Sequence, residues 1–75
     1  MPDPSIAPIR VVGLSVVDLA TSATWTVDVD GTTVAAGTAA DTTAAVDTGE
    51  AVVAAVRESF RVLGVAASTA PTTTS

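Results

Sequence analysis

The chain has 75 residues, a net charge of −5 and no Lys, His, Cys, Tyr, Asn or Gln. Without His, Cys and Lys it lacks the usual proton shuttles, covalent nucleophiles and zinc ligands, so we expect no enzyme activity, cofactor or metal site. Positive charge is limited to Arg10, Arg57 and Arg61, which are too few to neutralise a nucleic-acid backbone. No apolar run is long enough to span a membrane.

The residue usage also bears on the source and on stability. Lys, Asn and Tyr, which have AT-rich codons, are absent, while Ala, Val, Thr, Gly and Asp are plentiful. This usage is typical of a GC-rich gene, such as one from an actinobacterium or its phages. So short a chain forms one domain at most, and without disulfides or metals its core is marginal. We therefore expect it to gain apolar cover from a protein partner or from self-association.

The chain opens with residues 1–8, which contain three prolines and predict an extended N-terminal arm. Residues 9–19 are rich in Val and predict a strand. One face of this strand carries Val12, Leu14 and Val16, and the other carries Val11, Ser15, Val17 and Leu19. Because both faces are largely apolar, we expect both to be covered.

The same apolar run could be mistaken for part of a secretory signal peptide. Residues 11–17 follow Arg10, but Asp18 interrupts the run before any stretch of small residues. We therefore expect no signal peptide, and a location in the cytoplasm or in a virion.

Residues 24–36 predict a β-hairpin, because Asp30 and Gly31 lie between two alternating runs and favour a type I′ turn. A two-residue turn pairs Val29 with Thr32, Val27 with Val34 and Trp25 with Ala36. Asp28 and Asp30 also suggest a calcium loop. The positions that an EF-hand needs as acidic are Thr26 and Gly37, which disfavours that interpretation.

Residues 37–46 are compatible with a loop, a third strand or an early helical turn, and we favour strand or irregular structure. Asp47 predicts a helix N-cap with Glu50 three residues later, and Gly64 predicts the C-cap, so we expect a helix over residues 48–63. Residues 65–75, rich in Ala, Ser and Thr, predict a flexible tail or a second arm.

These elements predict an α+β fold in residues 9–64. A small antiparallel sheet, made of the hairpin and one or two further strands, is covered by a single C-terminal helix. The acidic residues fall at expected strand ends, turns and the helix start, where neither burial nor a close like charge would raise their pKa. The Ser and Thr hydroxyls have no adjacent base to activate them as nucleophiles. We therefore predict no catalytic, cofactor-binding or metal-binding residues.

The expected helix carries two uncharged stripes. The first is wide enough to cover the hairpin and consists of Val52, Val56, Phe60 and Leu63, with Val53 beside it. The second has mostly small side chains and consists of Ala51, Ala55, Ser59 and Val62. Small side chains let another backbone approach closely, so we predict that this second stripe contacts a second copy or a larger partner surface. The alternative is that Ala is simply a good helix former.

The order strand, hairpin, third strand and helix resembles the βββα core of HicB-type antitoxins, and residues 48–58 are similar to the helix opening in that family. The chain lacks the family's acidic, aromatic-rich hairpin and its Pro-x-Leu-x-Gly link. The resemblance implies a toxin-binding module. We favour a small accessory subunit of a larger assembly, such as a phage capsid or tail, with its arms ordered by neighbouring subunits. An acidic mimic of DNA needs a denser array of carboxylates and ranks last.

Overall fold

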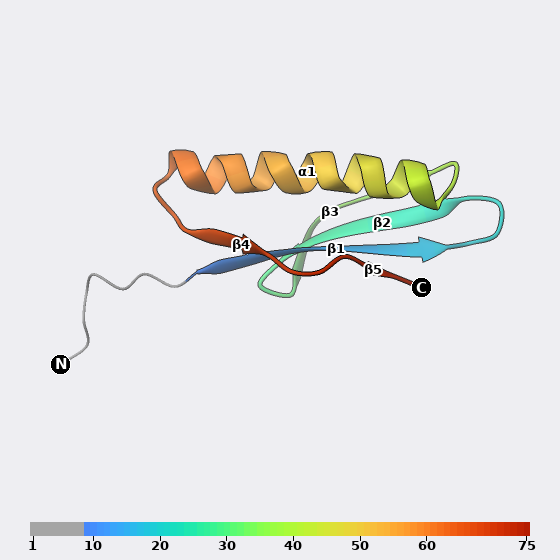
Figure 1. Cartoon of the computed structure of the whole chain (residues 1–75), viewed down its shortest axis with the longest axis horizontal. Coiled ribbons are helices and arrows are strands. Elements are labelled where there is room, and N and C mark those ends of the chain that lie inside the picture. The colour runs from blue at the N-terminus through green and yellow to red at the C-terminus, as the bar shows by residue number, and fades with distance from the viewer. Residues whose placement is uncertain (1–8) are drawn as a thin grey trace.

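The structure, a computed structural model, describes residues 9–75 as one sheet and one helix (Figure 1). In chain order the elements are β1 (Arg10–Asp18), β2 (Ala23–Val29), β3 (Thr32–Ala39), α1 (Thr42–Val62), β4 (Ala67–Thr69) and β5 (Thr73–Thr74). The strand order is β3-β2-β1-β4, and β5 also pairs with β1. The α+β prediction is confirmed, but the sheet is mixed and two strands follow the helix. The predicted arm, residues 1–8, lies outside the described residues.

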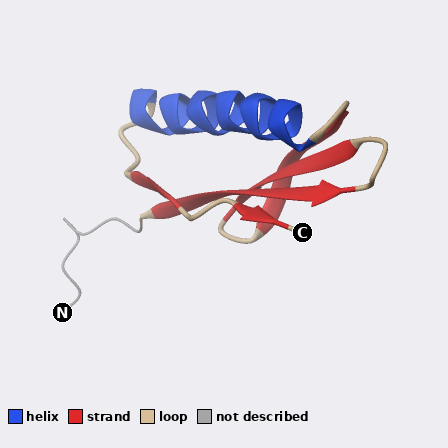
Figure 2. Ribbon diagram, turned by 45° about the vertical axis from the view of Figure 1, so that its right-hand side comes forward, coloured by secondary structure: helices blue, strands red, loops and turns tan. Residues whose placement is uncertain are grey.

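The helix packs on one face of the sheet only (Figure 2). Side chains of β1 alternate, so that Val12, Leu14 and Val16 are buried while Val11 and Val17 are 42% and 41% exposed. Within the described residues, the prediction that both faces of this strand are covered is therefore wrong. One helix supplies a layer for one face, and nothing in residues 9–75 supplies a second.

The hairpin turn is confirmed, since Asp30 and Gly31 both have positive φ, 51° and 83°, as a type I′ turn requires. Its predicted register holds at Val29 and Thr32 and then shifts by one residue at a β-bulge, so that Val27 pairs with Ala35. Val34 is the extra residue of the bulge and is 52% exposed.

The bulge has a clear packing reason at the single Trp. The shift places Gly37, instead of the predicted Ala36, opposite Trp25. The indole ring lies so close to this glycine that a Cβ there would be 2.7 Å from Trp25 Cζ2. A side chain at this position would collide with the ring, so the bulged register is the one that lets Trp25 lie flat on β3.

The helix begins earlier than the predicted residue 48. Asp41 is the N-cap, and its Oδ1 accepts a hydrogen bond from the backbone N–H of Ala44 at 2.8 Å. Asp47, the predicted cap, instead lies inside the helix and is exposed. Residues 37–46 therefore divide between the end of β3, the cap and the first helical turn.

Small residues on the buried side of α1 explain why its start was missed. The buried residues of the helix are Ala45, Gly49 and Val53, which are spaced four apart. A Cβ on Gly49 would lie 2.3 Å from Leu14 Cδ1, so the helix backbone approaches the sheet very closely here. Ala and Gly give almost no hydrophobic signal, yet they make this close contact possible.

The helix ends at Val62 with Leu63 as its C-cap, one residue earlier than predicted, and Gly64 follows the cap with φ +74°. The N–H of Gly64 donates to the carbonyl of Arg61 at 3.0 Å, and the N–H of Val65 donates to the carbonyl of Phe60 at 2.8 Å. This pair of bonds is the Schellman motif. Leu63, expected in the stripe that covers the hairpin, is 74% exposed and does not contribute to the core.

Residues 65–75, expected to form a flexible tail or arm, run along β1. β4 and β5 pair with β1 in parallel. The ladder continues to the last residue, where the N–H of Asp18 donates to the carbonyl of Ser75 and the N–H of Ser75 donates to that of Val16, both at 2.9 Å. The composition of this segment resembles a linker, but its backbone satisfies hydrogen-bonding groups that β1 would otherwise leave unpaired.

Candidate interaction surfaces

The acidic residues of the hairpin form bonds within the fold. Asp28 accepts a hydrogen bond from Thr33 Oγ1 at 3.1 Å, on the side of the sheet away from α1. Within residues 9–75 there is no cluster of acidic side chains that could hold a metal ion, and no polar or charged side chain is buried. Asp28 lies on β2, and Asp30 lies in the turn that follows it.

Asp30 links the hairpin tip to the start of β1. Its Oδ1 accepts from the Val11 N–H at 3.0 Å, its Oδ2 accepts from Arg10 Nη1 at 2.8 Å, and its own N–H donates to the Val11 carbonyl at 2.9 Å. The bond from the Val11 N–H, and then the bond from Arg10, lower the pKa of the Asp30 carboxyl. Arg10 is thus already paired with a carboxylate.

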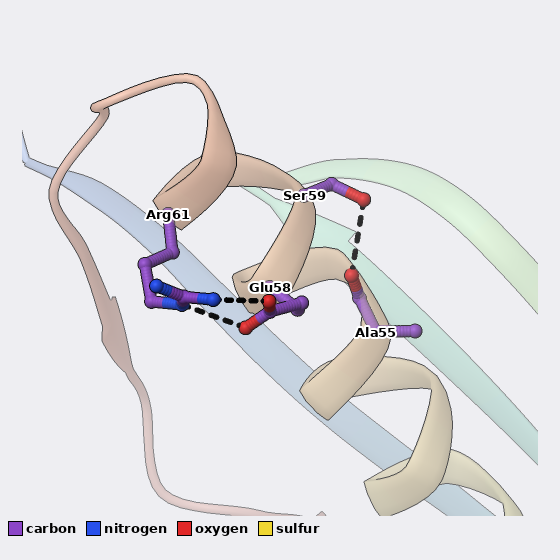
Figure 3. A network of polar contacts seen from close by, with 4 residues as sticks. All are labelled: Ala55, Glu58, Ser59 and Arg61. Atoms are coloured by element: carbon purple, nitrogen blue, oxygen red, sulfur yellow. Dashed lines mark hydrogen bonds and ion pairs between the residues drawn. The ribbon is translucent and has the colours of Figure 1, made fainter.

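A second ion pair lies on one side of α1 (Figure 3). Arg61 donates from Nε to Glu58 Oε2 at 2.8 Å and from Nη2 to Glu58 Oε1. The pairing lowers the pKa of Glu58 and raises that of Arg61. An open hollow of about 420 Å³ lies beside the pair and is lined by Ala54, Arg57, Glu58, Arg61, Val65, Ala66 and Ala67. It contains a carboxylate and has no buried polar group to orient a ligand, so it does not support an anion site.

The predicted contact stripe lies on an exposed part of the helix. Ala51, Ala55, Ser59 and Val62 are all exposed, and Val62 is 72% exposed. Ser59 Oγ donates to the Ala55 carbonyl at 3.1 Å, so the only hydroxyl of the stripe is already satisfied within the helix (Figure 3). The four residues therefore present an uncharged surface that needs no polar partner. Their role in binding stays a prediction.

Strand β3 lies at an edge of the sheet, a position that was not predicted. Its eight residues, Thr32–Ala39, contain neither a charged residue nor a proline. That composition can be read from the sequence. The edge position cannot, because it depends on β4 and β5 pairing with β1 at the other side of the sheet.

Within residues 9–75, no helix combines the length and the apolar character needed to cross a membrane. Comparisons of the chain with protein-family models, with curated proteins and with solved structures gave no match.

Proposed function

We propose that this chain is a non-enzymatic interaction protein, a small accessory subunit of a larger assembly such as a phage capsid or tail. The stripe formed by Ala51, Ala55, Ser59 and Val62 is its contact surface. The observation that carries this proposal is the exposure of an uncharged stripe along a helix that packs a different side on the sheet.

The thin core supports the proposal. The buried side chains of residues 9–75 are Val, Leu and Ala, while the two aromatic residues, Trp25 and Phe60, are only partly buried. A core this small leaves little stability in excess of the entropy cost of folding. Contact with another protein would add burial that the chain itself does not supply.

The C-terminal end of α1 has the most to gain from a partner. Val62 and Leu63 are 72% and 74% exposed, although Val and Leu gain about 1.5–3 kcal/mol each when fully buried. Glu58 lies one helical turn before Val62, so the charged pair borders this end of the stripe. Both carboxylate oxygens of Glu58 already accept from Arg61, so a partner that covers Val62 meets a paired charge.

A toxin-binding module is the second candidate. The order β1, β2, β3 and α1 is the order of the HicB-type core that the sequence resembles. An antitoxin is expected to form a complex of fixed stoichiometry with one partner protein, whereas a subunit of a capsid or tail is expected in a much larger particle. The size of the native complex therefore distinguishes the two.

We test the contact surface with Ala55→Arg and the matched control Ala54→Arg. Both positions are exposed on α1, and both substitutions change the net charge equally, but Ala54 lies beside the charged hollow and not in the stripe. The readout is the sedimentation of each variant in clarified extracts of the native host, followed by immunoblotting.

Wild type and Ala54→Arg should sediment with a large particle, and Ala55→Arg should move to the fraction of the free chain. A particle that retains Ala55→Arg would contradict the assignment of the stripe. Sedimentation of all three as the free chain would contradict the assembly role itself, and a small complex of fixed composition would favour the antitoxin module.

A further inference from the structure

The two edges of the sheet differ in how their backbone groups are protected. β1 is covered by β4 and β5, which are three and two residues long and are separated by a segment that contains Pro71. Short strands and proline are devices that keep an edge from pairing with another chain. β3, the opposite edge, is eight residues long and has neither proline nor charge.

The bulge restricts which part of β3 is available. It lies at Val34, near the turn, and residues 35–39 beyond it pair regularly with β2. Ala35, Gly37 and Ala39 lie on the helix side, while Ala36 and Thr38 lie opposite Thr26 and Thr24 on the open side. An edge strand of such small side chains lets a neighbouring backbone approach without steric obstruction. Within residues 9–75 no strand pairs with the outward N–H and C=O groups of β3.

The charges of α1 lie away from this edge. Asp47 lines a hollow together with Thr74 of β5, and Arg57, Glu58 and Arg61 line the hollow beside β4. These contacts place the charged side of the helix towards β4 and β5. The uncharged stripe defined above therefore lies on the flank towards β3, and Figure 3 shows Ser59 pointing away from Arg61.

This distribution matters because the whole chain is acidic. A net charge of −5 opposes self-association when the charges face each other. Along residues 35–39 of β3 they do not, because this part of the strand and the neighbouring helix flank are both uncharged. The acids nearest the strand are bonded within the fold, since Asp28 accepts from Thr33 near the turn and Asp41 caps α1.

We propose that two copies of this chain pair through β3, antiparallel and about a two-fold axis, to form one continuous sheet. An uncharged strand of alternating small residues is complementary to itself in this arrangement. Both helices then lie on the same face, with their stripes on the flanks that border the junction. The inference goes beyond the proposed function, since it assigns the self-pairing element and does not require the stripe to bind anything.

The test compares two double variants of equal charge. Ala36→Lys with Thr38→Lys places charge on the β3 edge, and Ser68→Lys with Thr74→Lys places it on the β4 and β5 edge; all four positions are exposed. Each double variant lowers the net negative charge by the same amount. If reduced repulsion between copies were the only effect, both double variants would associate more strongly than the wild type. Solution mass is measured by sedimentation equilibrium from the micromolar to the millimolar range.

We expect wild type and the Ser68→Lys/Thr74→Lys variant to reach twice the mass of the 7.3-kDa chain, and the Ala36→Lys/Thr38→Lys variant to remain a single chain. Equal masses for the two variants would overturn the proposal. So would a wild type that remains a single chain throughout, and in that case the stripe and its Ala55→Arg test would be unaffected.

Amide hydrogen exchange on the wild type provides a measurement that does not depend on any variant folding. Outward-facing amides in residues 35–39 should exchange about tenfold more slowly, or more, at the concentration where the dimer forms. Exchange in this segment that does not change with concentration would overturn the proposal. Protection seen only in the native particle would also overturn it, and would assign the edge to a strand of another protein.

Discussion

The two faces of the sheet are built from alternate residues of the same strands, yet only one face is packed. Val16 is 1% exposed and its neighbour Val17 is 41% exposed, although both are valines of the same apolar run. Helix α1 covers the face with Val16, and within residues 9–75 nothing covers the other. A valine of β1 is thus buried when it lies on the face that α1 covers, and its hydrophobicity alone does not decide this.

The largest expected effect comes from truncating adjacent valines on the two faces. Val16→Ala should lower the free energy of unfolding by about 2 kcal/mol, since it removes two buried methyl groups and leaves a cavity under α1. Val17→Ala should change it by less than about 0.5 kcal/mol. Chemical denaturation of both variants at one protein concentration measures the difference. An equal loss for Val17→Ala would show that the open face is covered in solution.

The packed face can be probed further at its closest contact. Gly49→Ala adds a Cβ 2.3 Å from Leu14 Cδ1, and Leu14 is itself 3% exposed and has little room to move. Replacing Gly by Ala inside a helix normally stabilises it by about 1 kcal/mol. Because the added methyl group collides with Leu14, we expect Gly49→Ala instead to lower the free energy of unfolding by about 1 kcal/mol.

A double-mutant cycle isolates that contact. In a Leu14→Val background the smaller side chain makes room for the new methyl group, and the cost of Gly49→Ala should shrink or become a gain. Thermal unfolding of the four proteins supplies the coupling energy. A coupling near zero would mean that Leu14 does not limit the approach of the helix.

Features set by local chemistry could be predicted from the sequence. The turn at Asp30 and Gly31 and the helix end at Gly64 both need positive φ, which these residues tolerate. The alternation of β1 showed which residues share a face, but it did not show which face is buried. The four residues of the contact stripe are exposed, and their role in binding stays a prediction.

Features set by tertiary contacts could not be predicted in this way. The bulge depends on Gly37, and not Ala36, lying against Trp25, and the helix start depends on Ala45 and Gly49 being small. The strands in residues 65–75 depend on the unpaired edge of β1. For the same reason the open edge at β3 was missed, because an edge is defined by where every other strand goes.

The smallest expected effect lies outside the packed face, at the salt bridge between Arg10 and Asp30. Both side chains are accessible to solvent, so the contribution of the pair to stability is modest and screened by salt. Asn keeps the hairpin turn favourable, since it also tolerates positive φ before Gly. Asp30→Asn therefore removes the charge and changes the turn little.

The sign of its pH dependence follows from the lowered pKa of Asp30. A carboxyl with a lower pKa in the folded state stabilises the fold above its unfolded pKa of about 3.9, and this contribution is lost as the pH falls through the folded pKa. Wild type should thus melt slightly above Asp30→Asn at neutral pH, and the two melting temperatures should converge in acid. Val16→Ala has no titrating group, so its deficit should persist across the same range. A gap between wild type and Asp30→Asn that does not change with pH would mean that the hairpin tip is held by its backbone bonds alone.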